Sequence, residues 1–455
     1  MNCIEGYSKR IVVVTTGTHG DVIPYLALSK GLQAAGHRVK LIASNEFTDL
    51  AAEHQIEFVS IGVDSTDFFK STAGKEVIGG NAFRIMRAMK HFFIPAVEKM
   101  LQSVWQETQD ADLIIYNYSV LSGSHIMEKL QIPGIACSYL PVLSPTGNFP
   151  LFGLPDWGKT LNKLSYSLNR LSSLPYNKVI QRWRKQHLGL PVRPRLADDL
   201  VLNNERIPVM YNSSPNVLDM VADKKNKIKA TGYWFLDEVS GHDEPNVDPE
   251  AQICAELKAF LQAGPEPVYI TFGSMVHKNP RQLTKTVVDA LQKTGNRGIL
   301  GIANGGLADI DLPDTVLSVS NVPYDWLFQR VKAVVHHGGY GTTMSVLRSA
   351  KPSLICPFFQ DQPFWGNLIY RSGLGGEPIP YKQLTVDKLA AAIELICADQ
   401  KMQAKLLELR EKIKHEQGVA TAVQFVQGVL DDYYKAKQLG SVLPSVKIKK
   451  LVSSC

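Results

Sequence analysis

Residues 10–44 read RIVVVTTGTHGDVIPYLALSKGLQAAGHRVKLIAS. The stretch begins with a continuous apolar run, passes through a helical pattern marked by Leu26, Leu28 and Leu32, and returns to a second apolar run after His37. Continuous apolar strands that alternate with amphipathic helices are typical of parallel sheets covered by helices on both faces. The stretch therefore predicts a strand, a helix and a strand, the first unit of a doubly wound α/β domain.

The same alternation recurs along the chain in two series. A chain of 455 residues is longer than a single hydrophobic core usually supports. Two series in a chain of this length predict two doubly wound, Rossmann-like domains. The further candidate strands lie at residues 112–116 and 134–137 in the first series and at residues 267–272, 298–302, 333–336 and 352–357 in the second.

An acidic stretch with Gly and Pro separates the two series at residues 236–250, and its composition predicts an exposed linker. Aromatic-rich, helix-like segments at residues 62–105 and 141–200 interrupt the strand rhythm and are candidate pocket walls. The predicted organisation is a first domain over residues 1–235, the linker over 236–250, a second domain over 251–410 and a helical segment with a tail over 411–455.

The overall composition is that of a globular protein with an ordinary core. The net charge is +6, but the Lys and Arg residues are spread along the chain, which does not favour nucleic-acid binding. Six widely separated cysteines show no zinc or redox spacing and indicate a reducing compartment. Since no apolar run approaches the roughly 20 residues of a membrane span, we expect a cytoplasmic protein with at most peripheral membrane contact.

The densest motif is residues 334–348, VVHHGGYGTTMSVLR, where an apolar strand ends in glycines and a helix begins near Thr342 and Thr343. Glycines let a ligand approach the backbone, and the first N–H groups of a helix attract an anion such as a diphosphate. The alternative is an ordinary strand-to-helix turn with threonine caps. The motif alone leaves both readings open.

Together with Pro352 and residues 357–367, PFFQDQPFWGN, this motif resembles the donor signature of the UDP-glycosyltransferase superfamily. Residues 325–328 and 361–366 are closest to sterol 3-beta-glucosyltransferases. The resemblance implies a GT-B fold, in which two Rossmann-like domains face a central cleft. It also implies an inverting transfer of a sugar, glucose from UDP-glucose, to a hydroxyl of a hydrophobic acceptor such as a sterol, with no cofactor and no metal ion.

The resemblance also assigns donor-binding roles to individual residues of the second domain. His337 would contact the diphosphate, and the acidic residue and glutamine of the signature would hold sugar hydroxyls. A loop after residues 268–272 would add a backbone N–H and a hydroxyl, and one backbone position would hold the nucleobase, although Asn321 stands where plant members have a stacking tryptophan. The implied donor residues are Gly273, Ser274, Val322, His337, Gly339, Gly341, Thr342, Thr343, Asp361 and Gln362.

Residues 17–24, GTHGDVIP, follow the first strand and open the first helix, so they lie at the sheet edge where doubly wound domains bind ligands. A glycosyl transfer needs a group that takes the proton of the acceptor hydroxyl, and His19 and Asp21 are the two candidates. Alignment with family members that read Gly-His-x-x-Pro puts the catalytic position at Asp21. Histidine-based members also have a partner aspartate where this chain has Asn117, and a carboxylate base needs no such partner.

Asp21 is therefore the predicted base and His19 the alternative. Asp21 could also be the N-cap of the first helix, a role that aspartate fills well. Free aspartate, with a pKa of about 3.9, is a weak base near neutral pH, so burial beneath an apolar acceptor is expected to raise it.

Other functions share parts of this pattern. A sugar-nucleotide epimerase has the same scaffold but lacks the pair Asp361 and Gln362 in this context, and a dehydrogenase needs a Gly-x-Gly-x-x-Gly turn that residues 17–22 do not form. A catalytically silent sugar-nucleotide-binding module is the alternative from a different class. A polyketide, terpenoid or flavonoid acceptor stays open because the acceptor side is built from loops.

Overall fold

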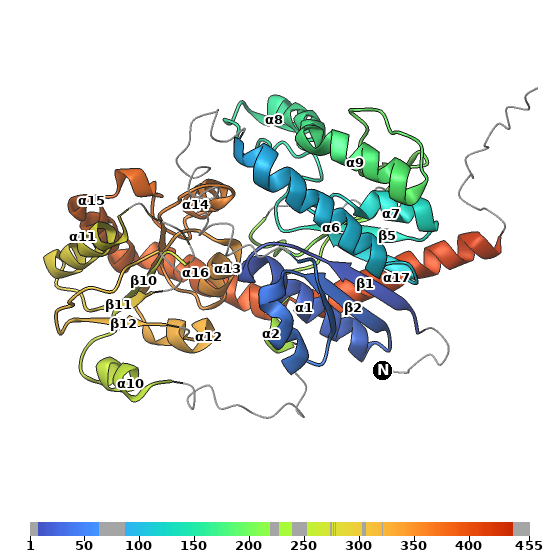
Figure 1. The fold of residues 1–455 in the computed structure, drawn as a ribbon. Helices are drawn as coiled ribbons and strands as arrows, with labels where there is room; N and C mark the ends of the chain where they lie inside the picture. Colours follow the sequence, from blue (N-terminus) through green and yellow to red (C-terminus); the bar gives the residue numbers. More distant parts are fainter. Residues whose placement is uncertain are drawn as a thin grey trace, which may run out of the picture.

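The computed structural model describes residues 8–62, 87–218, 227–238, 253–273, 275, 277, 279–302, 306–320 and 322–439. These residues form two parallel α/β sheets, each flanked by helices, side by side (Figure 1). The α/β class and the two doubly wound domains are as the sequence predicts.

The sheet of the first domain has seven strands in the order β3-β2-β1-β4-β5-β8-β9, and every pair is parallel. The strand order reverses between β1 and β4, which is where doubly wound sheets open a ligand site. A two-stranded hairpin, β6 (Val201–Leu202) and β7 (Glu205–Arg206), lies apart from the sheet. The seven strands are β1 (Arg10–Val14), β2 (Arg38–Ala43), β3 (Glu57–Ser60), β4 (Leu113–Asn117), β5 (Gly134–Ser138), β8 (Val209–Tyr211) and β9 (Ile228–Ala230).

The second sheet repeats the same plan with five parallel strands in the order β12-β11-β10-β13-β14, and its order reverses between β10 and β13. The strands are β10 (Val268–Thr271), β11 (Gly298–Gly301), β12 (Val316–Val319), β13 (Ala333–His336) and β14 (Ser353–Ile355). The carboxyl ends of β10 and β13 carry Gly273 and His337, so the predicted donor residues start from the reversal point.

Helices of the first domain cover both faces of its sheet. The α-helices are α1 (His19–Ala34), α2 (Thr48–Glu53), α6 (Ile94–Glu107), α7 (Gly123–Leu130), α8 (Lys159–Ser165) and α9 (Asn177–Trp183). Shorter 3₁₀ or π turns are η1 (Asn45–Phe47), η2 (Met89–Phe93), η3 (Tyr166–Leu171), η4 (Leu174–Tyr176) and η5 (Arg184–Leu188). Of the predicted pocket walls, residues 63–86 lie outside the described part of the chain.

The second domain and the C-terminal segment are likewise helical between strands. The α-helices are α10 (Ala255–Gln262), α11 (Pro280–Lys293), α12 (Tyr324–Leu327), α13 (Tyr340–Arg348), α14 (Gln362–Arg371), α15 (Val386–Ala398), α16 (Gln400–Lys414) and α17 (Gly418–Gln438). Short turns are η6 (Leu236–Glu238), η7 (Phe328–Arg330) and η8 (Tyr381–Gln383). Linker residues 239–250 lie outside the described residues. No helix within the described ranges is long and apolar enough to cross a membrane.

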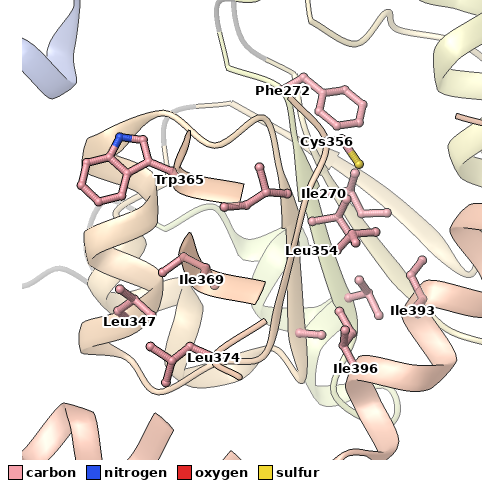
Figure 2. Packing of buried hydrophobic residues seen from close by; sticks show 14 of the residues in the cluster. Ile270, Phe272, Leu347, Leu354, Cys356, Trp365, Ile369, Leu374, Ile393 and Ile396 are labelled. Atoms are coloured by element: carbon pink, nitrogen blue, oxygen red, sulfur yellow. The ribbon is translucent and has the colours of Figure 1, made fainter. Parts of the chain in front are cut away.

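The core of the second domain forms on both sides of its sheet. Figure 2 shows Trp365 and Ile369 of α14 on one side of the strands and Ile393 and Ile396 of α15 on the other. All four side chains are at most 2% exposed. This packing holds α14 and α15 against opposite sides of the sheet.

The last helix, α17, returns from the second domain to the first and packs against α1 (Figure 1). Val419, Ala422, Val426 and Leu430 of α17 belong to the same buried cluster as Trp234 and the apolar face of α1. Burial of these side chains stabilises the return of the chain. The helix thereby fastens one domain to the other.

Candidate active site

The loop after β1 is shaped by a capping interaction that holds Asp21. Thr18 is the N-cap of α1, and Asp21 at the third helical position accepts a hydrogen bond from the Thr18 backbone N–H at 2.8 Å. Gly17 has φ +130°, and a Cβ at this position would lie 2.2 Å from Oδ2 of Asp21. The suggestion that Asp21 is the N-cap itself is wrong, because its carboxylate reaches back to the cap residue.

The two base candidates face different surroundings. Asp21 is half-buried, and burial raises the pKa of its carboxyl to about 6, against hydrogen bonds from Thr18 and from Tyr139 that lower it. His19 is exposed, with its ring 5.0 Å from that of Phe47, and desolvation lowers its pKa. Of the two, Asp21 has the environment of a base that works near neutral pH.

The N-terminus of α1 meets the N-terminus of α13 from the other domain. A Cβ at Gly341 would lie 3.2 Å from Cα of Gly20, and a Cβ at Gly20 would lie 3.3 Å from the Gly341 backbone nitrogen. Glycines at both positions thus let the two helix ends touch. Asp21, one residue after Gly20, is therefore brought beside the start of the glycine-rich helix.

His337 occupies a slot between two glycines. A Cβ at Gly273 would lie 2.9 Å from its Cε1, and a Cβ at Gly339 would lie 2.5 Å from its Nε2. Burial lowers the pKa of His337 to about 4, so the ring is neutral near pH 7. Its Nδ1 is buried without a hydrogen-bond partner among the described residues. An orphaned ring nitrogen of this kind suits a ligand that brings its own hydrogen-bonding oxygen.

Helix α13 offers backbone groups rather than free threonine hydroxyls. Gly339 is its N-cap, and the Thr343 hydroxyl donates to the Gly339 carbonyl at 2.9 Å. The Thr342 side chain hydrogen-bonds with the phenol of Tyr324. The first N–H groups of the helix, from Tyr340 to Thr342, lack intrahelical acceptors by helix geometry and form a positive end for an anion.

Asp361 and Gln362, the predicted sugar ligands, lie at the start of α14. Asp361 is 8% exposed and accepts a hydrogen bond from Trp365 Nε1 at 3.0 Å. Burial, with a smaller contribution from the charge of Asp21, raises its pKa to about 7. The Gln362 amide is engaged internally, because its Oε1 accepts from the N–H groups of Phe358 and Phe359 at 2.7 and 3.2 Å. Gln362 therefore shapes the loop that presents Asp361.

Three stacked aromatic rings, which the sequence reasoning missed, connect the carboxyls of Asp21 and Asp361. Tyr139, just after β5, stacks on Tyr340 at 4.8 Å, and Tyr340 stacks on Trp365 at 4.9 Å. Tyr139 is hydrogen-bonded to Asp21, while Trp365 donates to Asp361. Tyr139 follows a buried parallel strand, which is the signal that could have placed it at the same sheet edge.

The remaining predicted residues are only partly described. Val322 is half-buried beside α12, whereas Ser274 and Asn321 lie outside the described residues. Within the residues that the structure describes, no three His, Cys, Asp or Glu side chains are grouped so that they could hold a metal ion.

Comparison with known domains and structures agrees with this geometry. Residues 11–144 match the glycosyltransferase family 28 N-terminal domain, and residues 285–424 match the erythromycin biosynthesis protein CIII-like C-terminal domain. The glycosyltransferase of kitacinnamycin superposes with a TM-score of 0.65 at 18% identity, over 93% of this chain and 100% of that one. The calicheamicin glycosyltransferase gives 0.62 at 17% identity, over 94% and 99%. The chain therefore has the GT-B fold of these enzymes, and a region in each of its two domains matches a glycosyltransferase domain model.

The chain is also similar in sequence to sterol 3-beta-glucosyltransferases. It is 34% identical to the enzyme of Emericella nidulans, over 92% of this chain and 30% of that protein. The enzyme of Komagataella phaffii is 32% identical, over 91% and 34%. The chain thus spans about a third of the length of these curated relatives. The family resemblance read from the donor signature is confirmed.

Proposed function

We propose that the protein transfers glucose from UDP-glucose to a hydroxyl of a sterol, with inversion at the anomeric carbon and without a metal ion. The observation that carries the proposal is the contact of Gly20 with Gly341, which brings Asp21 of one domain to the N-terminus of α13 in the other. The sterol acceptor and the glucose donor are supported by the similarity to sterol 3-beta-glucosyltransferases over more than nine-tenths of this chain.

In the proposed reaction Asp21 is the general base. Its carboxylate takes the proton as the acceptor oxygen forms a bond to the anomeric carbon, and the bond from that carbon to the diphosphate oxygen breaks on the opposite face. With its pKa raised to about 6, the carboxyl is still ionised near pH 7 yet is a stronger base than free aspartate. A single displacement of this kind inverts the configuration.

The leaving diphosphate is stabilised by the second domain. The N–H groups at the start of α13 and the neutral ring of His337 supply hydrogen bonds where negative charge develops. Asp361 accepts hydrogen bonds from sugar hydroxyls, and Tyr139 holds the Asp21 carboxylate in place. No step in this scheme requires a metal ion.

The proposal is tested by incubating the full chain with UDP-glucose and a panel of sterols, polyketides, terpenoids and flavonoids. We expect release of UDP coupled to formation of a sterol β-glucoside. Transfer confined to another aglycone class would remove the sterol assignment. UDP-glucose binding without turnover on the whole panel would favour the silent binding module instead.

A further inference from the structure

Helix α8 buries polar side chains and exposes leucines. Asn162 and Ser165 are only 1% and 6% exposed, whereas Leu161 and Leu164 are 51% and 65% exposed. A helix on the surface of a protein ordinarily buries the leucines and exposes the polar residues. This reversed arrangement leaves apolar side chains exposed to water, and a binding partner could cover them.

Hydrogen bonds fix this orientation, so the helix cannot simply roll its leucines inward. The Asn162 amide donates to the Gly147 carbonyl at 3.2 Å and to Oδ1 of Asp156 at 2.8 Å. The Ser165 hydroxyl accepts from the Leu151 backbone N–H at 2.8 Å. Rotation would leave these buried polar groups unpaired, which is costly.

The exposed apolar side chains continue beyond the helix. Leu168 and Leu171 of η3 are each 45% exposed, and Trp157 and Phe152 before α8 are 51% and 40% exposed. We call these six residues the apolar face: Phe152, Trp157, Leu161, Leu164, Leu168 and Leu171. Several large apolar residues exposed on one short segment favour an interaction site, whereas scattered single ones do not.

The segment around the apolar face is strongly basic. Residues 145–197 contain nine Lys and Arg residues and one acidic residue, a formal net charge of +8. Arg184 and Arg193 are ion-paired with Glu128 beneath the surface, and Arg170 pairs with Asp198 at 3.7 Å, so the surface carries a smaller positive excess than this count. The even spread of positive charge inferred from the sequence therefore does not hold here. Lys159, Lys163 and Arg170 are exposed on the same two elements as the leucines. Exposed leucine and tryptophan beside lysine and arginine are typical of helices that lie in a membrane interface.

The apolar face borders the two-domain site. Phe149, at the start of the loop that leads to α8, packs edge-on against Phe364 of α14 at 5.4 Å, and Asp156 pairs with Arg371 of α14 at 3.2 Å. Helix α14 begins directly after Asp361. In Figure 1, α8 and α9 form the outer edge of the molecule above α6.

We infer that the apolar face docks on a lipid bilayer that contains anionic headgroups, with the leucines inserted shallowly and Lys159, Lys163 and Arg170 at the headgroups. The bilayer is favoured over a protein partner because the excess charge has the sign that anionic lipids attract. This part of the inference rests on the proposed function: docking would place the first domain, which binds the acceptor, beside the membrane in which a sterol is dissolved.

The test measures binding of the full chain to vesicles, with no glycosyl transfer involved. Wild-type protein is expected to sediment with vesicles of equal parts phosphatidylcholine and phosphatidylserine, and less with phosphatidylcholine alone. The double variant Leu161→Ser/Leu164→Ser should bind the mixed vesicles about tenfold less tightly or worse. The matched control is Leu395→Ser/Leu407→Ser, which changes exposed leucines of α15 and α16 and should bind like wild type.

A second variant keeps the leucines in case their replacement disturbs folding. Lys159→Gln/Lys163→Gln should weaken binding to the mixed vesicles while leaving the weak binding to phosphatidylcholine unchanged. Wild-type protein that ignores both vesicles, or equal losses in the leucine variant and its control, would overturn the inference. The inference would also be overturned if wild-type protein were a dimer and the leucine variant a monomer, because the apolar face would then join two copies of the chain.

Failure of the docking and failure of the proposed function are separable. Transfer to a sterol carried by cyclodextrin needs no bilayer, so the leucine variant should retain it. Vesicle binding without any transfer would refute the function and leave the docking intact, and transfer without vesicle binding would do the reverse.

Discussion

The carboxyls of Asp21 and Asp361 come from different domains, and burial raises the pKa of each, to about 6 and about 7. A buried carboxyl next to a second one keeps its proton to higher pH than a free one. Two carboxyls with raised pKa values that interact across a domain boundary are typical of a functional site. Both carboxyls with a raised pKa therefore lie where the two domains meet.

The raised pKa of Asp361 makes the stability of the fold depend on pH. Because the folded pKa of Asp361 lies above that of the unfolded chain, the folded state holds a proton that the unfolded state has released between about pH 4 and pH 7. The contribution of this group to the free energy of unfolding therefore falls as the pH rises through that window. Between about pH 4.5 and 7.5, which spans this window, the free energy of unfolding should fall less in Asp361→Asn than in wild type. Urea unfolding at each pH measures it. Asp309→Asn, an exposed position, should follow wild type, and parallel curves for all three proteins would contradict the assignment.

His337 supports a second prediction at the residue scale. If its ring contacts the diphosphate, His337→Ala should weaken UDP binding about tenfold, the usual loss for a hydrogen bond to a charged group. Calorimetry with UDP measures this directly, and His415→Ala, an exposed histidine, is the control. Unchanged UDP affinity would remove His337 from the phosphate site.

At the scale of elements, the contact between α1 and α13 depends on two glycines. A methyl group at position 341 would press on Cα of Gly20 at 3.2 Å, so Gly341→Ala should separate the helix ends and lower kcat/KM about tenfold, as small displacements of reacting groups do. Gly428→Ala in α17 meets no atom within 4 Å and should leave kcat/KM unchanged. Equal activity of Gly341→Ala and wild type would show that the contact does not matter for catalysis.

The sequence predicted most elements of the two sheets because the buried strands are uniformly apolar. It missed β3, β8, β9 and β12. Strand β3 is half-exposed and reads Glu57-Phe-Val-Ser, and β8 and β9 are only three residues long, so none of these shows an extended apolar run. The glycine motif predicted α13, although the helix begins at Tyr340, two residues before Thr342, and its N-cap is Gly339 rather than a threonine. Hydrogen bonds such as those of Gln362 to the loop before it leave no trace in a residue pattern.

At the scale of the whole molecule, the domains are joined by α17 and by Tyr340. The Tyr340 phenol donates to the Asn212 carbonyl at 2.5 Å and lies 3.1 Å from the Ser213 hydroxyl, both in the first domain. Neither junction could be predicted from the sequence. An apolar helix face does not specify which domain it covers, and a tyrosine within a glycine motif does not name its distant partner.

Tyr340→Phe should therefore loosen the domain arrangement while each domain stays folded. We expect a larger radius of gyration in X-ray scattering and a loss of about 1 kcal/mol in the free energy of unfolding, the usual worth of a buried hydrogen bond. Tyr211→Phe removes a buried phenol whose partners, Leu143 and Ser144, lie within the first domain, and it should not change the radius. An unchanged radius for Tyr340→Phe would show that other contacts hold the domains together.

The central claim is that Asp21 removes the acceptor proton, and its most direct test is turnover and UDP-glucose affinity of Asp21→Asn beside His19→Ala. Asparagine keeps the shape of the capping interaction with Thr18 but cannot take a proton, so turnover should fall about a hundredfold or more with donor affinity preserved. Wild-type kcat/KM should rise with pH through about 6, the raised pKa of Asp21. A folded, active Asp21→Asn enzyme together with an inactive His19→Ala enzyme would contradict the account and transfer the role to His19.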